Sequence, residues 1–334
     1  MKKIMLFTII LGFSVLSFSQ TKVGTTAANF LTIPIGPRAT GMGSAFVAVS
    51  DDATSAFWNP GGLSRLTRNE LTFSYTEWLV KTKLNYIALA YKLDENNAIA
   101  ISINQLDYGE EEITTELEQN GTGEYWKAQD LAVGLSYASN LTDRFSIGGT
   151  VKYITQSIWN ESASAFAVDV GLLFNTPLDG LRLGMNISNF GTEMQLDGKD
   201  LLLAADIDPT NTGNNSTISS TLETESWPLP LVFSVGLGYD IVNASDWRWI
   251  IAADALVPNN QSTYFNQGTE LIWNNIVSLR VGYTALNKED AEEGLTAGIG
   301  LQYDFGGFFA KVDYSYTDFG IFNEISRVSI SVGL

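Results

Sequence analysis

Two adjacent carboxylates, Asp51 and Asp52, are the first side chains in the sequence whose type and spacing allow a chemistry of their own. Such a pair can share a proton, as catalytic dyads do, or accept hydrogen bonds from the backbone or from an arginine or lysine. The chain contains no histidine and no cysteine, which removes Ser-His-Asp and Cys-His catalysis and the common zinc sites. We therefore expect the pair to stabilise a local structure and the protein not to be an enzyme.

Turn-forming residues follow the two carboxylates. In DDATSAFWNPGGL, residues 51–63, Asn59 and Pro60 can form a turn because proline fixes φ, and Gly61 and Gly62 allow backbone conformations closed to other residues. These side chains are predicted to be structural. Where they lie depends on the elements that surround them.

The first 19 residues have the features of a secretory signal peptide. Lys2 and Lys3 form a positively charged start, residues 4–16 are apolar, and Ser17 and Ser19 are the small residues expected before a cleavage site. The apolar run is shorter than the roughly 20 residues that span a bilayer, which favours a cleaved signal over an anchor helix. No cysteine follows, so a lipid anchor is not expected.

The net charge argues against a nucleic-acid partner. The sequence has 19 Lys and Arg residues against 37 Asp and Glu residues, and its formal charge of −18 becomes −20 when the two signal lysines are removed. Binding to nucleic acid or to an anionic membrane surface requires an excess of basic residues. Without cysteine, the fold must be stabilised by burial and backbone pairing, with no disulfide.

Alternation of apolar and polar residues predicts β-strands over the rest of the chain. FSIGGTVKY from Phe145, LAVGLSY from Leu131 and LVFSVGLGYD from Leu231 place apolar side chains on one face and small or polar ones on the other. The apolar face often ends in tyrosine or tryptophan. This is typical of a transmembrane barrel with lipid outside, a polar lumen and aromatic girdles, so we expect outer-membrane lipid around it. A secreted β-rich protein is the alternative.

Fourteen such segments are expected, at residues 69–79, 83–92, 98–106, 124–137, 145–156, 162–175, 181–190, 229–240, 247–257, 266–274, 276–285, 294–304, 307–316 and 325–334. Tight-turn signals alternate with longer connections such as 107–123, 191–228 and 287–294. Outer-membrane barrels have an even strand number, short periplasmic turns and longer outer loops. The pattern predicts an all-β fold, a 14-stranded antiparallel transmembrane barrel over residues 69–334, with periplasmic termini.

Residues 20–68 precede the first strand and need a buried location. They contain too many glycines and turn formers for a spanning strand, and they are too apolar for a free tail. A 14-stranded barrel has an open lumen unless something fills it. We therefore expect residues 20–68 to form a small glycine-rich plug inside the barrel.

GPRATGMGSAFVAVSDDATSAFWNPGGLSRL, residues 36–66, resembles the N-terminal signature of FadL-like outer-membrane barrels, in which an Asp-rich step and an Asn-Pro-Ala or Asn-Pro-Gly turn follow a glycine-rich segment. With GTTAANFLTIPIGPRA in front, it more closely resembles the PorV/PorQ branch found in Bacteroidota and related bacteria. The positions that match the signature are Asp51, Asp52, Asn59, Pro60 and Gly61. The chain departs from better-known PorV proteins in being shorter and from PorQ-like proteins in its opening motif.

The resemblance implies a 14-stranded barrel with an N-terminal hatch and a place in type IX secretion in the outer membrane of a Gram-negative bacterium. PorV-like members bind the large secretion barrel, or receive cargo by its C-terminal domain and carry it to the surface attachment complex. No cofactor is implied. FadL-type channels for hydrophobic solutes are the alternative, and they need a greasy pocket behind the plug. The polar inward face of the strands favours the first function.

The expected outer loops contain candidate contacts for a partner. Five carboxylates gather in the first long connection, at Glu110, Glu111, Glu112, Glu116 and Glu118, although such a run is usually only solvated. Trp227 in WPLPLVF offers an apolar surface before the eighth strand. No metal site is predicted, because DIDPTNTGNN at 206–215 lacks the closing glutamate of a calcium loop.

Overall fold

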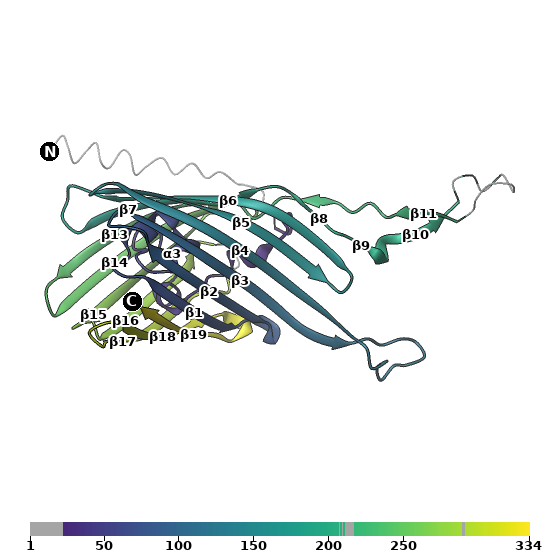
Figure 1. Cartoon of the computed structure of the whole chain (residues 1–334). Helices are drawn as coiled ribbons and strands as arrows, with labels where there is room; N and C mark the ends of the chain where they lie inside the picture. Colours follow the sequence, from purple (N-terminus) through teal and green to yellow (C-terminus); the bar gives the residue numbers. More distant parts are fainter. Residues whose placement is uncertain (1–22, 207, 209, 211–216, 289–290) are drawn as a thin grey trace.

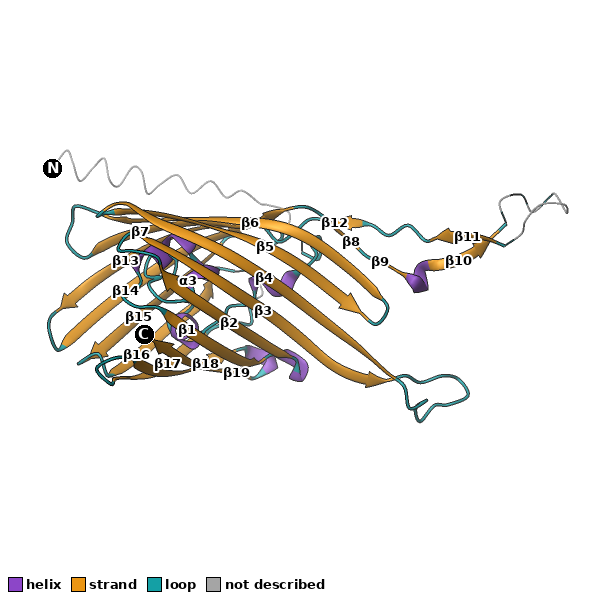
Figure 2. Cartoon of the chain, in the orientation of Figure 1, coloured by secondary structure: helices purple, strands orange, loops and turns teal. Residues whose placement is uncertain are grey.

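The fold is a closed antiparallel barrel of fourteen strands, seen from the side in Figures 1 and 2. The computed structural model describes residues 23–334 except 207, 209, 211–216 and 289–290, so the predicted signal peptide lies outside the described residues. The all-β class and the strand number predicted from the sequence are confirmed. Among the described residues, no helix is long and apolar enough to cross a membrane.

Each barrel strand pairs with its neighbours along the chain, and β1 pairs with β19 to close the ring. The barrel strands are β1 (Glu70–Glu77), β2 (Lys83–Lys92), β3 (Asn97–Glu112), β4 (Tyr125–Thr142), β5 (Phe145–Ile158), β6 (Glu161–Asn175), β7 (Leu181–Gly191), β13 (Val232–Asn243), β14 (Trp247–Pro258), β15 (Tyr264–Trp273), β16 (Val277–Leu286), β17 (Leu295–Asp304), β18 (Phe309–Asp318) and β19 (Glu324–Gly333).

The remaining elements are short. Five strands lie in the connection from β7 to β13: β8 (Met194–Gln195), β9 (Asp197–Gly198), β10 (Leu202–Ala205), β11 (Ile218–Thr221) and β12 (Ser226–Trp227). The helices are η1 (Asn29–Thr32), α2 (Pro37–Gly41), α3 (Ser55–Trp58), η2 (Pro60–Arg65), η3 (Leu79–Lys81), η4 (Lys199–Leu201) and η5 (Gly320–Phe322).

The two faces of the barrel wall differ as the alternation predicts. Along β1, Thr72 and Ser74 are buried, whereas Phe73 and Tyr75 between them are exposed. At the closure, the hydroxyl groups of Thr72 and Ser331 lie 2.6 Å apart inside the barrel. The apolar exterior can face lipid directly, without a covering layer. The closed ring also pairs the backbone groups of its strands, which lipid could not do.

The two ends of the barrel have different connections. The end with the turns β2–β3, β4–β5, β6–β7, β13–β14, β15–β16 and β17–β18 is called here the short-turn end, and the opposite end the long-loop end. At the β15–β16 turn, Asn274 and Asn275 have φ values of 50° and 56°, as a tight hairpin turn requires. The C-terminal Leu334 pairs with Asn69 at the short-turn end.

One strand, β3, extends further towards the long-loop end than its alternation indicates. β3 ends at Glu112 and β4 begins at Tyr125, so the hairpin projects from the long-loop end (Figure 1). The expected loop at 107–123 is therefore partly strand. Beyond a bulge after Asp107, pairing resumes between Glu110 and Lys127, where opposite charges face each other across the ladder.

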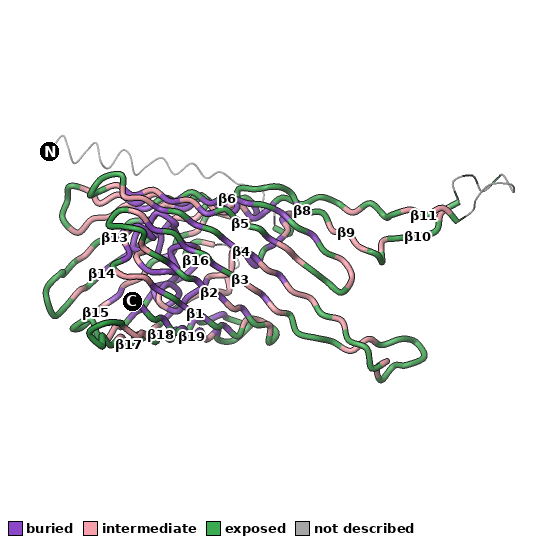
Figure 3. Tube along the Cα trace, in the orientation of Figure 1, coloured by how far each residue is buried: buried purple, intermediate pink, exposed green. Residues whose placement is uncertain are grey.

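Residues 23–68, called here the N-terminal segment, pack inside the barrel. α2 packs against β16–β19, and η2 packs against β3–β6, so the segment contacts two different arcs of the wall. Buried residues gather within the barrel (Figure 3). Their apolar part combines this segment with inward-facing alanines on the wall, such as Ala88, Ala100 and Ala165. Small wall side chains leave the space that the segment occupies.

Candidate functional site

The site is centred on the guanidinium group of Arg38, in α2, to which both predicted carboxylates bind. Arg38 Nη1 donates to Asp51 Oδ1 at 2.5 Å and to Asp52 Oδ2 at 2.9 Å. Arg38 Nη2 donates to Glu270 Oε2 on β15 at 3.0 Å, and Nε donates to Glu270 Oε1 at 3.1 Å. One cation therefore joins a turn of the N-terminal segment to the barrel wall.

The charges around Arg38 keep the pair Asp51 and Arg38 ionised. Burial alone raises the pKa of Asp51, but the positive charges of Arg38, Arg248 and Arg182 bring this pKa below its usual range. Burial alone would lower the pKa of Arg38. The negative charges of Asp51, Glu270 and Asp52 outweigh the effect of burial, so the pKa of Arg38 is raised above its usual value. A carboxylate that stays ionised in this way binds a cation and is a poor proton donor.

Asp52 also begins the helical turn that follows it. Its Oδ1 accepts from the backbone N–H of Thr54 at 3.0 Å and from the Thr54 hydroxyl at 2.5 Å. This aspartate turn leads into α3, and Asp52 thus combines a backbone role with its ion pair to Arg38. Both carboxylates therefore have structural partners.

Asn59 connects three parts of the molecule. It is fully buried, its Nδ2 donates to Val47 O at 2.8 Å and to Leu172 O on β6 at 3.0 Å, and its Oδ1 accepts from Gly61 N at 3.1 Å. All three of these hydrogen bonds join the Asn59 side chain to backbone atoms. The side chain fixes the start of η2 against the wall, where Pro60 occupies the first helical position.

Glycines on both partners allow this close contact. A Cβ at Gly171 on β6 would collide with Asn59 Oδ1, and one at Gly148 on β5 would collide with the backbone of Pro60. Within the segment, a Cβ at Gly62 would lie 2.5 Å from Ser50 O, and one at Gly61 would lie 3.0 Å from Gly171 O. Gly171, Gly148 and Gly62 are therefore restricted to glycine, whereas a Cβ at Gly61 would make a tight contact.

Charged residues on the inner wall complete the site, and the sequence analysis did not identify them. Arg280 on β16 bonds to Glu270 at 2.7 Å and to Asp313 on β18 at 2.6 Å. Asp254 on β14 accepts from the backbone N–H groups of Phe46 at 2.7 Å and Val47 at 2.9 Å. The signal that marks them is a charged residue at an inward position of an otherwise apolar strand, as in IIAADALV around Asp254.

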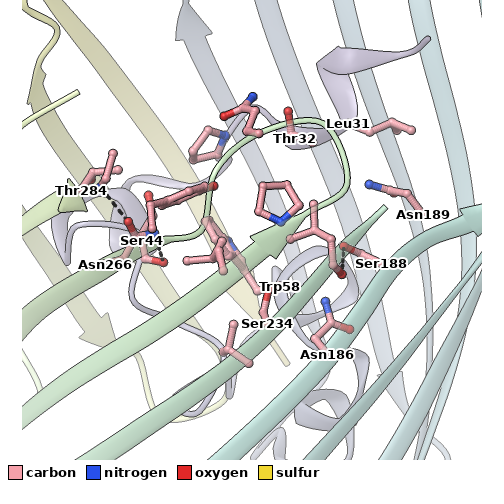
Figure 4. Close-up of a pocket in the computed structure, with 18 of the residues that line it drawn as sticks. Leu31, Thr32, Ser44, Trp58, Asn186, Ser188, Asn189, Ser234, Asn266 and Thr284 are labelled. Carbon is pink, nitrogen blue, oxygen red and sulfur yellow. Dashed lines mark hydrogen bonds between the residues drawn. The ribbon is translucent and has the colours of Figure 1, made fainter. Parts of the chain in front are cut away.

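A cavity of about 120 Å³ lies between the N-terminal segment and the wall towards the long-loop end (Figure 4). Leu31 and Trp58 line it from the segment, and Asn186, Asn189 and Asn266 line it from the wall. The Oδ1 atom of Asn186 has no hydrogen-bond partner within the described part of the chain. The cavity is smaller than the roughly 300–1,000 Å³ of typical ligand pockets, and its lining is mixed, not uniformly greasy.

The candidate partner contacts lie on two separate projections at the long-loop end. Glu110, Glu111 and Glu112 end β3, and Glu116 and Glu118 lie in the connection beyond it. The Glu112 carboxylate already has a partner within the hairpin, since it accepts a hydrogen bond from the backbone N–H of Gly123 at 2.9 Å. Trp227 lies in β12, which pairs with β8, and is 44% exposed. The structure does not bring the tryptophan and the glutamates into one surface.

No group of three or more metal-ligating side chains occurs among the described residues. The predicted absence of a calcium loop concerns 206–215, most of which lies outside the described residues. Several ionic groups in the lumen bind one another, and others, such as Asp254, bind the backbone of the N-terminal segment. Chemically, the site is a set of buried ion pairs and backbone acceptors.

Solved structures with a similar fold include a FadL homologue, a hydrocarbon channel and a toluene transporter. A Pseudomonas aeruginosa FadL homologue is 12% identical, with 90% of this chain and 98% of that chain covered and a TM-score of 0.53. The CymD monoaromatic hydrocarbon channel is also 12% identical, with 89% and 96% covered and a TM-score of 0.56. The Pseudomonas putida toluene transporter TodX is 12% identical, with 89% of this chain and 96% of that chain covered and a TM-score of 0.54. These likenesses show the FadL-like fold.

At the level of sequence, no curated protein matches the chain. The family model of the type IX secretion system protein PorV matches residues 17–216, more than half of the chain. The match includes the whole N-terminal segment and the first seven barrel strands, and it agrees with the resemblance seen in residues 36–66. The chain therefore belongs to the PorV family of type IX secretion system proteins and is a β-barrel of the outer membrane.

Proposed function

We propose that the protein is a non-enzymatic component of type IX secretion that binds the large translocon, or the C-terminal domain of exported cargo, and passes cargo to the cell-surface attachment complex. Membership of the PorV family supports this function. In the same proposal residues 1–19 are a signal peptide, 20–68 a plug and 69–334 the barrel. The short-turn end, where Leu334 lies, faces the periplasm, whereas the first described residues lie at the long-loop end, where Ala27 N donates to Pro228 O.

The observation that carries the proposal is the filled lumen. Arg38 ties the N-terminal segment to Glu270, Asn59 ties it to Leu172, and Asp254 binds its backbone at Phe46. Opening a passage would break several buried polar contacts together, and each of them is costly to leave unpaired. The working surface is therefore the long-loop end, and Asp51, Asp52, Asn59, Pro60, Gly61 and Gly62 keep the lumen closed.

Two projections form that working surface. The β3–β4 hairpin presents Glu110, Glu111, Glu116 and Glu118, and the β7–β13 connection presents Trp227. Exposed aromatic side chains are frequent anchors of protein interfaces, and the carboxylates on the other projection select a basic partner.

Photo-crosslinking in native outer membranes tests this proposal. A photoreactive residue at Leu117, which is 96% exposed on the β3–β4 connection, should capture a large outer-membrane protein or a cargo C-terminal domain, identified by mass spectrometry. Leu178, which is 67% exposed at the short-turn end, is the matched control and should not capture the same protein. Capture from Leu178 alone would contradict the assigned working surface.

A FadL-type channel for hydrophobic solutes is the second candidate, supported by the cavity beside Trp58. Its small size and the unpaired Asn186 amide oxygen favour the secretion function over it. Titration of the purified protein with toluene distinguishes the two. Saturable quenching of tryptophan fluorescence, lost in a Leu31→Phe variant that narrows the cavity, would support the channel.

A further inference from the structure

A second and larger cavity, of about 680 Å³, opens at the short-turn end between the N-terminal segment and β6, β7, β13 and β14. Arg65 at the end of η2, Arg182 on β7 and Arg248 on β14 line it. Its volume is within the range of ligand pockets. Three separate elements thus bring their guanidinium groups to one polar cavity of a chain with 37 acidic and only 19 basic residues.

The positive charges of these arginines are incompletely balanced. Arg65 binds neutral acceptors, the Ser146 hydroxyl at 2.7 Å and the Asp143 backbone carbonyl at 3.1 Å. Arg182 Nη2 donates to Asp240 Oδ1 at 2.8 Å, and Arg248 shares that same oxygen at 3.5 Å. One carboxylate therefore serves two guanidinium groups.

The other carboxylates that line the cavity do not complete this balance. Asp51 lies 2.5 Å from Arg38 but 3.9 Å from Arg248, so its charge is directed mainly to Arg38. Asp179 is exposed in the turn between β6 and β7. Neither of these side chains forms a close ion pair with Arg65, Arg182 or Arg248.

Unused hydrogen-bond donors point to the same conclusion. Arg65 Nη2 and Arg182 Nε are buried and have no hydrogen-bond partner among the residues that the structure describes. Burial and the nearby positive charge of Arg182 also lower the pKa of Arg65, a sign that the two cations repel each other. An anion between them would relieve this repulsion and supply acceptors.

We propose that this cavity is a binding site for an oxyanion, a phosphate or carboxylate group, held between Arg65, Arg182 and Arg248. A planar guanidinium group can donate two parallel hydrogen bonds to the oxygens of one phosphate or carboxylate group. The oxyanion has two sources with the same chemistry. It is either a soluble anion that enters through the mouth, or the headgroup of a lipid, because exposed Leu178 and Ile241 lie at the cavity rim.

Two measurements on the purified full-length protein separate these sources. The first is calorimetric titration with inorganic phosphate in detergent. The second is native mass spectrometry after reconstitution in phosphatidylcholine with phosphatidylglycerol. Arg248→Gln should weaken binding about tenfold, and Arg182→Gln combined with Arg248→Gln should abolish it, because each removes charge-assisted hydrogen bonds. The matched control is Arg144→Gln, an exposed arginine in the β4–β5 turn at the same end.

Binding of phosphate that is lost in the cavity variants but kept in Arg144→Gln supports a soluble ligand. Retention of phosphatidylglycerol with the same pattern supports a lipid ligand. The proposal is overturned if the unmodified protein binds neither probe, or if Arg248→Gln binds as tightly as Arg144→Gln. Arg248 has the longest ion pairs of the three, so its single variant provides a folded test even if the double variant fails to assemble.

Discussion

Arg38 and Glu270 form a two-point ion pair inside the lumen, although 232 residues separate them in the sequence. The opposite side of the same guanidinium group binds Asp51 and Asp52. Arg38 is also 5.2 Å from the ring centroid of Phe46, which covers it from the segment side. A single side chain therefore links the aspartate turn, the segment core and the barrel wall.

Replacing Arg38 tests this linkage. Arg38→Gln leaves the buried carboxylates of Asp51, Asp52 and Glu270 without their shared cation, a change that destabilises folded proteins by about 3–5 kcal/mol. We expect the variant to lose its heat-resistant folded band on gels at a lower temperature. In planar bilayers it should open more often than the unmodified protein.

A second arginine provides the control for that experiment. Arg68 pairs with Asp304 at 2.7 Å, but the two side chains are 38% and 47% exposed. Exposed pairs of this kind contribute about 0–1 kcal/mol, so Arg68→Gln should leave both measurements nearly unchanged. Equal effects of the two substitutions would contradict the special role of Arg38.

The barrel was predictable from sequence because its alternation is local. FSIGGTVKY shows which side chains of β5 face lipid, and Asn274 with Asn275 shows where β15 turns into β16. Both patterns need only neighbouring residues. By contrast, the alternation around Glu111 gave no strand, because the outer part of β3 is paired with β4 above the barrel and needs no apolar face.

The partners inside the lumen were not predictable in the same way. Period-two alternation places Asp254 on the inward face, but it does not say that the backbone of Phe46 lies opposite. That contact depends on the path of the N-terminal segment across the lumen. The motif residues Asp51 and Asn59 could be identified from their turn chemistry, whereas the contact of Glu270 with Arg38 depends on the path of the N-terminal segment.

A wall glycine tests how tightly the N-terminal segment fits. A Cβ at Gly268 on β15 would collide with the backbone of Met42, so Gly268→Val should displace the segment from the wall. We expect a higher bilayer conductance and faster proteolysis within residues 36–66. Gly307→Val is the control, because nothing lies within 4 Å of a Cβ there. Normal protease resistance in Gly268→Val would argue against close packing at this position.

The pH dependence of closure follows from Asp51. Burial opposes its ionisation, but Arg38, Arg248 and Arg182 place its pKa below the ordinary value of 3.8. A carboxyl whose pKa is lower in the folded state stabilises that state above pH 3.8, and the stabilisation disappears as pH falls through the lowered pKa. Conductance should therefore stay low down to pH 3.8 and rise below it. Asp51→Asn should show a smaller acid-induced rise, and an unchanged profile would exclude Asp51 as its cause.

The proposed orientation can be tested on intact cells. An epitope inserted between residues 119 and 120 lies in the exposed β3–β4 connection and should leave assembly intact, because added loop length has a small entropic cost. It should be labelled by an antibody without permeabilisation. The same epitope between Gly306 and Gly307, in the β17–β18 turn, should be labelled only after permeabilisation. The reverse labelling pattern would show that the barrel has the opposite orientation in the membrane.

Deleting residues 24–62 tests the plug itself. The deletion removes α2, α3 and the Asn59 amide that donates to Leu172 O, together with the backbone N–H groups that Asp254 binds, while the pairing of β1 with β2 and β19 remains. Ladder hydrogen bonds and lipid burial hold the barrel without the segment, so it should still assemble and keep its heat-resistant gel mobility. The wall facing the emptied space has small side chains, such as Ala88 and Ser74, that cannot fill it.

Water and small ions should then pass through the emptied lumen. Planar-bilayer recordings should show stable conductance for the deletion variant, little for the full-length protein, and intermediate, flickering openings for Arg38→Gln. The graded order follows because the point variant loses one anchor, while Asn59 and Asp254 still hold the segment. Equal conductance of the full-length and deleted proteins would show that residues 24–62 do not close the barrel, and the Asp51–Gly62 turn would then have only a local structural role.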